Sequence, residues 1–317
     1  MASGIASLPY GMKPSISIVA LVIAPIYFIA IEEIIMIAVT GATGQLGRLV
    51  IEALLKTVPA NQIVAAVRNV DKAADLAAKG VLVRQADYSK PATLASAFTG
   101  IDKLLLISSS EVGQRAPQHQ AVIDAAKAAG VKLLAYTSIL HADTSPLLLA
   151  EEHRATEAYI KQRGVPAVLL RNGWYSENYT MGVAAAIEHG AVAGCANDAR
   201  LATATRQDYA EAAAKVLTSE HQAGKVYELA GDTAFTLTEF AHSISQLSGK
   251  KVVYQNLSEA DYVALLEKVG VPGPFAAVLG NSETGAAKGA LFDDGHQLSA
   301  LIGRATTPIV DSIKAVL

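Results

Sequence analysis

Residues 36–55 read MIAVTGATGQLGRLVIEALL, and this stretch decides the fold. An apolar run over residues 36–40, suited to a buried strand, leads directly into a turn with three glycines, and a helix-like segment follows. Gly41 permits a tight turn, Gly44 lets backbone N–H groups approach a phosphate, and Gly47 lets the helix pack closely. Because the N-terminus of a helix favours negative charge, the stretch predicts a binding site for the pyrophosphate of a dinucleotide.

Six further apolar runs follow at the spacing expected of strands. They occupy residues 62–67, 81–86, 103–108, 132–137, 167–171 and 225–229. Helix-like segments alternate with them at residues 45–55, 70–79, 92–98, 117–129 and 150–163. The runs LLLIS and LLAYTS are almost wholly apolar, as strands buried on both faces of a parallel sheet must be. The pattern predicts the α/β class, with a doubly wound Rossmann sheet.

The pattern loosens after residue 172 into shorter elements. We expect these at residues 237–247, 252–255, 258–269 and 307–316. The Rossmann core is therefore expected over about 36–172, with a smaller C-terminal α/β cap lobe mostly over 173–317. Ligands of open parallel sheets bind beyond the carboxyl ends of the strands, so the cap should close over that edge and complete a substrate cleft.

Composition and charge narrow the possible partners. The chain has 317 residues, of which 51% are hydrophobic and 17% charged, and its formal net charge is -3. This composition provides no basic field for nucleic acid or an anionic membrane, so we expect a small-molecule substrate and a monomer or homodimer. The single Cys195 cannot form an internal disulfide, and no Cys/His cluster has zinc spacing. We expect a cytoplasmic protein without a metal site.

An apolar run at residues 16–31 precedes the first strand. It is interrupted by Pro25 and is shorter than the ~20 residues that a membrane-spanning helix needs. No small-x-small cleavage site precedes Glu32, so it is a poor signal peptide. We expect residues 1–35 to be an N-terminal extension outside the fold, with Met36 as the functional start. A membrane anchor and an additional packed strand or helix are the alternatives.

The end of the second strand carries a cation where NAD-binding proteins carry an acid. In AAVRNVDKA, Arg68 occupies the position of the carboxylate that binds the ribose 2′-hydroxyl of NAD. A guanidinium matches the geometry of a phosphate, so we expect Arg68, with Lys72 nearby, to bind the 2′-phosphate of NADP. The alternative is a solvated surface arginine. The sequence therefore predicts NADPH rather than NADH.

Polar residues also follow the third, fourth and sixth strands. Asp87 and Tyr88 should cover the adenine, unless they form a simple turn. A serine turn after the fourth strand should lie beside the ribose and phosphates, unless it only caps a helix. The loop after the sixth strand should meet the nicotinamide, unless its two aromatic residues belong to the core. The expected cofactor-binding set is Gly41, Ala42, Thr43, Gly44, Gln45, Leu46, Gly47, Arg68, Asp87, Ser108, Ser109, Ser110, Asn172, Gly173, Trp174, Tyr175, Ser176 and Glu177.

The helix expected at residues 150–163 lacks the usual catalytic pair. Short-chain dehydrogenases, whose GxxGxxG spacing this chain shares, carry Tyr-x-x-x-Lys there, and the tyrosine donates a proton. Here His153 and Glu157 occupy those places. His153 is a candidate proton donor, with a partly exposed helix histidine as the alternative. Tyr175 is a second candidate catalytic residue.

The absence of the Tyr-x-x-x-Lys pair indicates which class of substrate the protein can reduce. A quinone that takes up hydride becomes a hydroquinone anion, whose conjugate acid resembles a phenol with a pKa of about 10. Such a product needs little help from a strong acid, so proximity and orientation can supply most of the acceleration. The aromatic loop 174–179 suits a flat partner. The pattern therefore favours a flat electron acceptor over an alcohol or ketone.

The segments GATGQLG, VRN, QADY, LLLISSSEVGQRAPQH, YTSILHADTSPL and LLRNGWYSENY occur in order, and with them the chain resembles the NmrA-like atypical short-chain reductases from Met36 to the C-terminus. The resemblance implies a bilobed cytoplasmic enzyme that reduces quinones to hydroquinones by two-electron hydride transfer from NADPH. It also implies that the glycine loop, Arg68 and the two later turns contact the cofactor. Two alternatives remain: a reductase of other flat acceptors such as triphenylmethane dyes, and a non-catalytic NADP(H) redox sensor.

Replacing Arg68 by Asp should weaken the binding of NADPH far more than that of NADH. The new carboxylate would repel a 2′-phosphate, whereas it can accept a hydrogen bond from a 2′-hydroxyl. Fluorescence titration of the variant with each cofactor measures the two affinities. Equal losses for both cofactors would contradict the assignment of Arg68.

Overall fold

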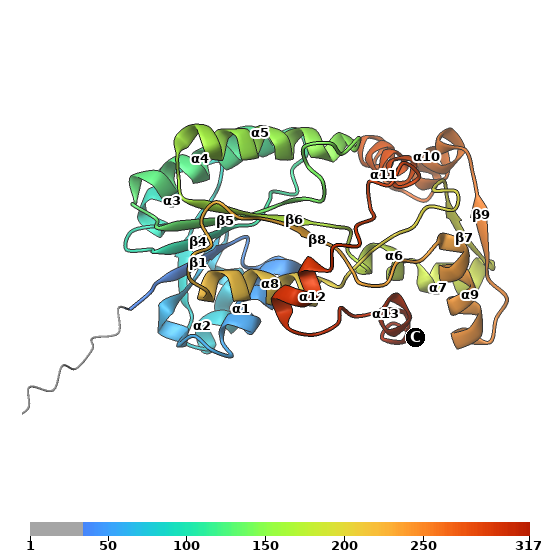
Figure 1. Cartoon of the computed structure of the whole chain (residues 1–317), viewed down its shortest axis with the longest axis horizontal. Helices are drawn as coiled ribbons and strands as arrows, with labels where there is room; N and C mark the ends of the chain where they lie inside the picture. Colours follow the sequence, from blue (N-terminus) through green and yellow to red (C-terminus); the bar gives the residue numbers. More distant parts are fainter. Residues whose placement is uncertain (1–33) are drawn as a thin grey trace, which may run out of the picture. The chain divides into compact units, whose positions relative to one another are not determined.

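A seven-stranded parallel sheet organises residues 34–317, the part of the chain that the computed structural model describes (Figure 1). Its order is β3-β2-β1-β4-β5-β6-β8, and every neighbouring pair is parallel. The strands are β1 (Ile37–Thr40), β2 (Ile63–Val67), β3 (Leu82–Gln85), β4 (Lys103–Leu106), β5 (Leu133–Ile139), β6 (Ala167–Asn172) and β8 (Val226–Leu229). All seven expected strands are present, and the prediction of a Rossmann-type α/β fold is confirmed.

Helices cover both faces of this sheet. One face carries α1 (Gln45–Leu54), α2 (Ala74–Ala78), α8 (Arg206–Thr218) and α12 (Gln297–Ile302), and the other carries α3 (Pro91–Ala97), α4 (Arg115–Ala128) and α5 (Leu148–Arg163) (Figure 1). Val50 and Leu54 are fully buried in the first layer, and Val122 and Ile123 in the second. Burial of each such side chain contributes about 1.5–3 kcal/mol, so a strand covered on both faces favours apolar residues along most of its length.

Short 3-10 helices precede β2 and α2. η1 (Ala60–Gln62) leads into β2, and η2 (Val70–Ala73) precedes α2. The helix expected at residues 70–79 therefore begins as a 3-10 turn, because the side chain of Asn69 accepts a hydrogen bond from the Asp71 N–H at 2.9 Å. The Asn69 side chain thus caps the start of η2, and the chain turns tightly directly after Arg68.

The chain returns to the Rossmann layers after residue 172. β8 extends the sheet, α8 packs against α1, and α12 packs against α8. No helix is predicted from the sequence over α8, because the segment AEAAAKVL is rich in alanine and its apolar periodicity is weak. A capping box starts this helix: the Thr205 hydroxyl accepts from the Asp208 N–H at 3.2 Å, and the Asp208 carboxylate accepts from the Thr205 N–H at 3.1 Å.

The remaining elements form a smaller lobe. They are α6 (Glu177–Thr180), α7 (Val183–His189), β7 (Ala191–Gly194), α9 (Leu237–Ser248), β9 (Val253–Asn256), α10 (Glu259–Lys268), α11 (Gly273–Ala286) and α13 (Ile309–Lys314). β7 and β9 pair in parallel, and the core of this lobe includes Phe235 and Phe240, whose rings lie 5.9 Å apart. The expectation for residues 1–35 falls outside the described residues, except at positions 34 and 35.

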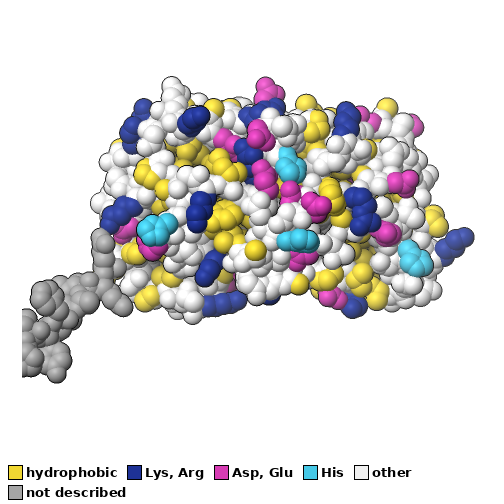
Figure 2. Space-filling model, in the orientation of Figure 1, with side chains coloured by type: hydrophobic (Ala, Val, Ile, Leu, Met, Phe, Trp, Pro, Cys, Tyr) yellow, Lys and Arg dark blue, Asp and Glu magenta, His cyan; other side chains and the backbone are white. Residues whose placement is uncertain are grey.

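The distribution of surface charge and the length of the helices can be compared with the expectation that the protein binds neither nucleic acid nor a membrane. On the face drawn in Figure 2, Lys and Arg side chains are interspersed with Asp and Glu side chains. Within residues 34–317, no helix combines the length and the apolar character needed to cross a membrane.

The smaller lobe contains a buried carboxyl group on α11. Glu283 is 7% exposed, and its Oε2 accepts a hydrogen bond from the Cys195 N–H at 2.5 Å. Burial raises the pKa of Glu283 to about 7, since the charged form loses its hydration. The fold therefore favours the protonated carboxyl group.

Glu283→Gln should change the pH dependence of stability. The protonated carboxyl contributes stability that is fully present below its ordinary pKa of 4.5 and is lost as the pH rises through about 7. The amide keeps an accepting oxygen but does not ionise. The free energy of unfolding of the variant, relative to the parent, should therefore increase between pH 5 and 7, by at most about 1.4 kcal/mol per pH unit. Urea unfolding at several pH values measures this difference, and a pH-independent difference would refute the shift.

Candidate cofactor-binding site

A cavity of about 540 Å³ opens at the carboxyl ends of the parallel strands. Its walls come from the loops that follow β1, β2, β3, β4 and β6, and from the start of α8. Of the residues predicted from the sequence, those that line it are Gly41, Thr43, Gly44, Gln45, Leu46, Gly47, Arg68, Asp87, Ser108, Ser109, Ser110 and Tyr175. The topology therefore brings one polar loop from each of several separate strands into one site.

The glycine loop leaves the first turn of α1 open to a ligand. Gly41 has φ +58, a conformation that favours glycine, and its carbonyl accepts the Gly44 N–H at 2.9 Å. A Cβ at Gly47 would lie 2.4 Å from the Gly41 oxygen, so only glycine allows this approach. No side chain caps α1 at Gly44. The loop and the N-terminal amides of the helix together fit a pyrophosphate.

Arg68 faces the cavity from the end of β2 and is already paired. Its Nη1 donates to Glu111 Oε1 at 2.9 Å, and Glu111 Oε2 accepts from Gln118 Nε2 at 2.7 Å. The Arg68 side chain is 73% exposed, so solvent screens this ion pair. Lys72 does not line the cavity. Arg68 thus lies where it could bind a phosphate in the cavity. Without a ligand, its guanidinium is paired with Glu111.

Hydrogen bonds hold the turns after β3 and β4. Asp87 Oδ1 accepts from the Ser89 N–H at 3.0 Å and shapes the turn that faces the cavity. The Tyr88 hydroxyl lies 2.5 Å from Thr40 Oγ1 and 2.9 Å from the Ile107 carbonyl oxygen, so it ties β3 to β1 and β4. Both Asp87 and Tyr88 therefore form a turn and line the cavity.

The serine turn is anchored from α4 by His119. The Ser109 N–H donates to His119 Nε2 at 3.0 Å, so the ring carries its proton on Nδ1, which lies 2.9 Å from Thr156 Oγ1. Burial lowers the pKa of His119 to about 4. His119 is therefore neutral at physiological pH and positions the turn as a hydrogen-bond acceptor.

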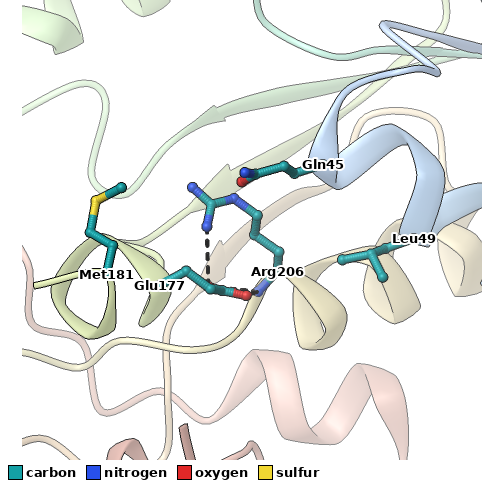
Figure 3. A pocket seen from close by; sticks show the side chains of 5 residues that line it. All are labelled: Gln45, Leu49, Glu177, Met181 and Arg206. Atoms are coloured by element: carbon teal, nitrogen blue, oxygen red, sulfur yellow. Dashed lines mark hydrogen bonds and ion pairs between the residues drawn. The ribbon is translucent and has the colours of Figure 1, made fainter. Parts of the chain in front are cut away.

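Residues of the loop after β6 contribute partly to the cavity and partly to the core. Tyr175 lines the cavity, and the guanidinium carbon of Arg206 lies 4.4 Å from the centre of its ring. Glu177 Oε1 accepts from the Arg206 N–H at 2.9 Å, and the two side chains form an ion pair at 3.4 Å. Figure 3 shows Arg206 between Gln45 and Glu177, in a second cavity of about 270 Å³. Glu177 therefore orients Arg206.

The other predicted residues lie outside the lining of the 540 Å³ cavity, although Glu177 lines the second cavity. Ala42 is fully buried, and Trp174 packs against the core of the smaller lobe. The hydroxyl groups of Ser176 and Thr203 lie 2.8 Å apart and are buried. Among the described residues, the lining of the 540 Å³ cavity excludes Ala42, Asn172, Gly173, Trp174, Ser176 and Glu177.

Comparison with known proteins assigns the chain to a family. Residues 35–312 match the model of the NmrA-like family. The chain belongs to the NmrA-like family. It is 61% identical over 278 residues to quinone oxidoreductase 2 of Escherichia coli (strain K12), and the match covers 88% of this chain and 97% of that protein.

Two solved structures resemble this NmrA-like protein closely. The E. coli NADPH-dependent quinone oxidoreductase complexed with NADPH has 60% identity and a TM-score of 0.87, covering 89% of this chain and 99% of that one. The Citrobacter sp. triphenylmethane reductase complexed with NADP(H) has 43% identity and a TM-score of 0.86, covering 89% and 100%.

The predicted proton donor on α5 is not at the site of this NmrA-like protein. His153 is 5% exposed and does not line the cavity, and its Nδ1 lies 2.7 Å from the Tyr136 hydroxyl. Burial lowers the pKa of His153 to about 3, so the ring is neutral at physiological pH. Glu157 binds the Arg171 guanidinium through both oxygens, at 3.1 and 2.8 Å. The expectation of a partly exposed histidine at position 153 is therefore wrong, and the candidate proton donor is neutral and lies outside the lining of the cavity.

Three charged residues of the site were not identified from the sequence. Arg115, Glu111 and Arg206 line the cavity. The motif from Thr205 to Asp208 could have located the start of α8 and hence Arg206. Arg115 stands in the first turn of α4, where the helix dipole disfavours a cation, and Glu152 Oε2 lies 4.0 Å from its Nε.

Glu111→Gln should strengthen NADPH binding to this NmrA-like protein, by up to about fivefold. The exposed pair with Arg68, worth about 0.2–1 kcal/mol, would no longer have to break before a 2′-phosphate binds. NADH affinity should stay unchanged. Fluorescence titration measures both, with Glu52→Gln as the control, since Glu52 pairs with Lys79 on the exposed surface away from the cavity. Weaker NADPH binding by the Glu111 variant would rule out competition for Arg68.

Proposed function

We propose that this chain reduces quinones to hydroquinones by two-electron hydride transfer from NADPH. The observation that carries the proposal is its 61% identity to the E. coli quinone oxidoreductase 2, extending over 97% of that protein. The physical basis is a cavity in which an uncapped helix N-terminus and an arginine lie along one sheet edge. That arrangement suits an extended ligand with a pyrophosphate and a further phosphate.

NADPH would lie along the carboxyl ends of the strands. The glycine loop from Gly41 and the first amides of α1 would hold its pyrophosphate, and Arg68 would bind the 2′-phosphate in place of Glu111. Tyr88 would cover the adenine half, and Tyr175 would face the nicotinamide half. When bound, NADPH supplies the hydride for the reaction.

The described residues favour orientation over acid catalysis. His153 is buried and neutral, and Glu157 is bound to Arg171. Burial raises the pKa of Tyr175, so its hydroxyl keeps its proton and is a hydrogen-bond donor, not a strong acid. A hydroquinone anion, whose conjugate acid has a pKa of about 10, can take its proton from water. Rate acceleration then comes from holding the acceptor against the reduced cofactor.

A second candidate is the reduction of triphenylmethane dyes. The 43% identity to the Citrobacter triphenylmethane reductase, over 100% of that chain, favours it. A dye cation that receives hydride becomes neutral, so it needs no proton donor either. The shared requirement is a flat acceptor placed beside the nicotinamide.

A panel of acceptors tests these functions. Purified protein is mixed with NADPH and a benzoquinone, a naphthoquinone or a triphenylmethane dye, and the loss of NADPH absorbance is followed. We expect saturable turnover with quinones and much slower turnover with NADH. Turnover of the dye alone would support the second candidate. Tight NADP binding without turnover of any acceptor would refute both reactions and favour a redox sensor.

A further inference from the structure

Arg206 lies where two cavities and the starts of two helices meet. It lines both the 540 Å³ cavity and the 270 Å³ cavity, and Gln45 also lines both. Gln45 is the first residue of α1, and Arg206 is the first residue of α8. Figure 3 shows the Arg206 side chain between Gln45 and Glu177. The start of α8 therefore brings a cation to the start of α1.

The two helix starts differ in whether a carboxylate satisfies them. At α8, both oxygens of Glu177 accept from the Arg206 N–H, at 2.9 and 3.2 Å. At α1, Gly44 provides no side-chain cap, and the first turn holds no acidic residue. The first turn of a helix favours negative charge. An anion brought by a ligand would supply at α1 what Glu177 supplies at α8.

The guanidinium of Arg206 is held in place and stays open to the cavities. Its carbon lies 4.4 Å from the centre of the Tyr175 ring, Nη2 donates to Asn178 Oδ1 at 3.1 Å, and Nη1 lies 3.4 Å from Glu177 Oε2. The side chain is 17% exposed, and within residues 34–317 no nitrogen of Arg206 is both enclosed and unpaired. A ligand in either cavity can therefore reach a cation that is already oriented, which reduces the entropy lost on binding.

The three arginines of the 540 Å³ cavity occupy different places. Arg68 follows β2, which flanks β1 on the side away from β4, and it is placed for the 2′-phosphate. Arg115 is held by the Ser109 carbonyl at 2.6 Å, and its Nη1 is enclosed. Of the three, Arg206 is the one that also lines the second cavity beside Gln45. It is therefore the arginine placed for the pyrophosphate itself.

We propose that Arg206 binds the pyrophosphate of the cofactor and neutralises part of its charge. This inference rests on the part of the proposed function in which NADPH binds with its pyrophosphate at the glycine loop. The amides of α1 would bind the pyrophosphate on one side and the Arg206 guanidinium on the other. Glu177 and Tyr175 act as positioning residues for the guanidinium. NADPH and NADH share the pyrophosphate, so this contact adds affinity for both, and the discrimination between them stays with Arg68.

Binding of four ligands to Arg206→Gln tests the assignment. NADPH, NADH and ADP-ribose contain the pyrophosphate, whereas 2′-AMP contains a 2′-phosphate without it. The variant should bind the first three more weakly by a common factor, about tenfold to a hundredfold for a lost charge-assisted contact, and 2′-AMP within about twofold of the parent. Isothermal titration calorimetry measures all four affinities without turnover. Clearly unequal losses for NADPH and NADH, or an unchanged affinity for ADP-ribose, would overturn the proposal.

Matched variants separate this contact from a general loss of structure. Arg68→Gln should show the complementary pattern, with weaker binding of NADPH and 2′-AMP and unchanged binding of NADH and ADP-ribose. Arg206→Lys should retain part of the affinity for ADP-ribose, because it keeps the charge but loses the planar fork. Arg200→Met is the control, since Arg200 is exposed and pairs with Glu239 outside the cavity.

The outcome for Arg206 is distinguishable from the outcome for quinone reduction. An equal loss of 2′-AMP and ADP-ribose binding in both Arg206 variants would refute a local contact with the pyrophosphate. If the parent protein turned over no acceptor, the proposed reaction would fail, while the titrations with ADP-ribose and 2′-AMP would still decide the role of Arg206.

Discussion

The close approach of Gly47 to the backbone of Gly41 is the contact on which the site depends. The Cβ of any other residue at position 47 would lie 2.4 Å from the Gly41 oxygen, so α1 can start directly behind β1 only with glycine there. This approach leaves the start of α1 without a side-chain cap and turned toward the cavity. α1 in turn packs against α8, which carries Arg206 to the same cavity. The glycine contact and the packing of α8 on α1 thus place a phosphate site and a cation together.

Burial decides how the charged and polar side chains around this site behave. His119 on α4 and His153 on α5 are both buried, so both rings are neutral. His119 accepts a hydrogen bond from the Ser109 N–H, and His153 Nδ1 lies 2.7 Å from the Tyr136 hydroxyl. Arg68 stays exposed, and its ion pair with Glu111 is weak enough to be exchanged for a phosphate. Arg115 is buried but incompletely paired. The cavity therefore combines an exchangeable cation, Arg68, with a fixed one, Arg115, whose Nε donates to the Ser109 carbonyl.

The candidate site was predictable where it follows strand ends and unpredictable where it depends on side-chain direction. Arg68 directly follows a buried strand, so the edge of the sheet brings it to the cavity whatever else packs nearby. Trp174 and Tyr175 are consecutive, yet Trp174 packs into the smaller lobe and Tyr175 lines the cavity. Helical spacing placed His153 where a catalytic tyrosine is expected, but it could not reveal that Tyr136 from the sheet covers that face.

By itself the sequence determined the strands, their parallel arrangement in a doubly wound sheet and the dinucleotide loop, because these follow from short-range patterns: apolar runs, glycine spacing and helix starts. The order of the strands in the sheet came from the tertiary structure. It could not place α8, whose alanine-rich surface carries little periodic signal. Only the tertiary structure decided which charges are satisfied. Glu177, read from the sequence as a cofactor contact, supports Arg206, and Arg115 keeps a free nitrogen. Ion pairs and hydrogen bonds of this kind join residues far apart in the chain, and a local sequence pattern does not indicate which distant residues will be in contact.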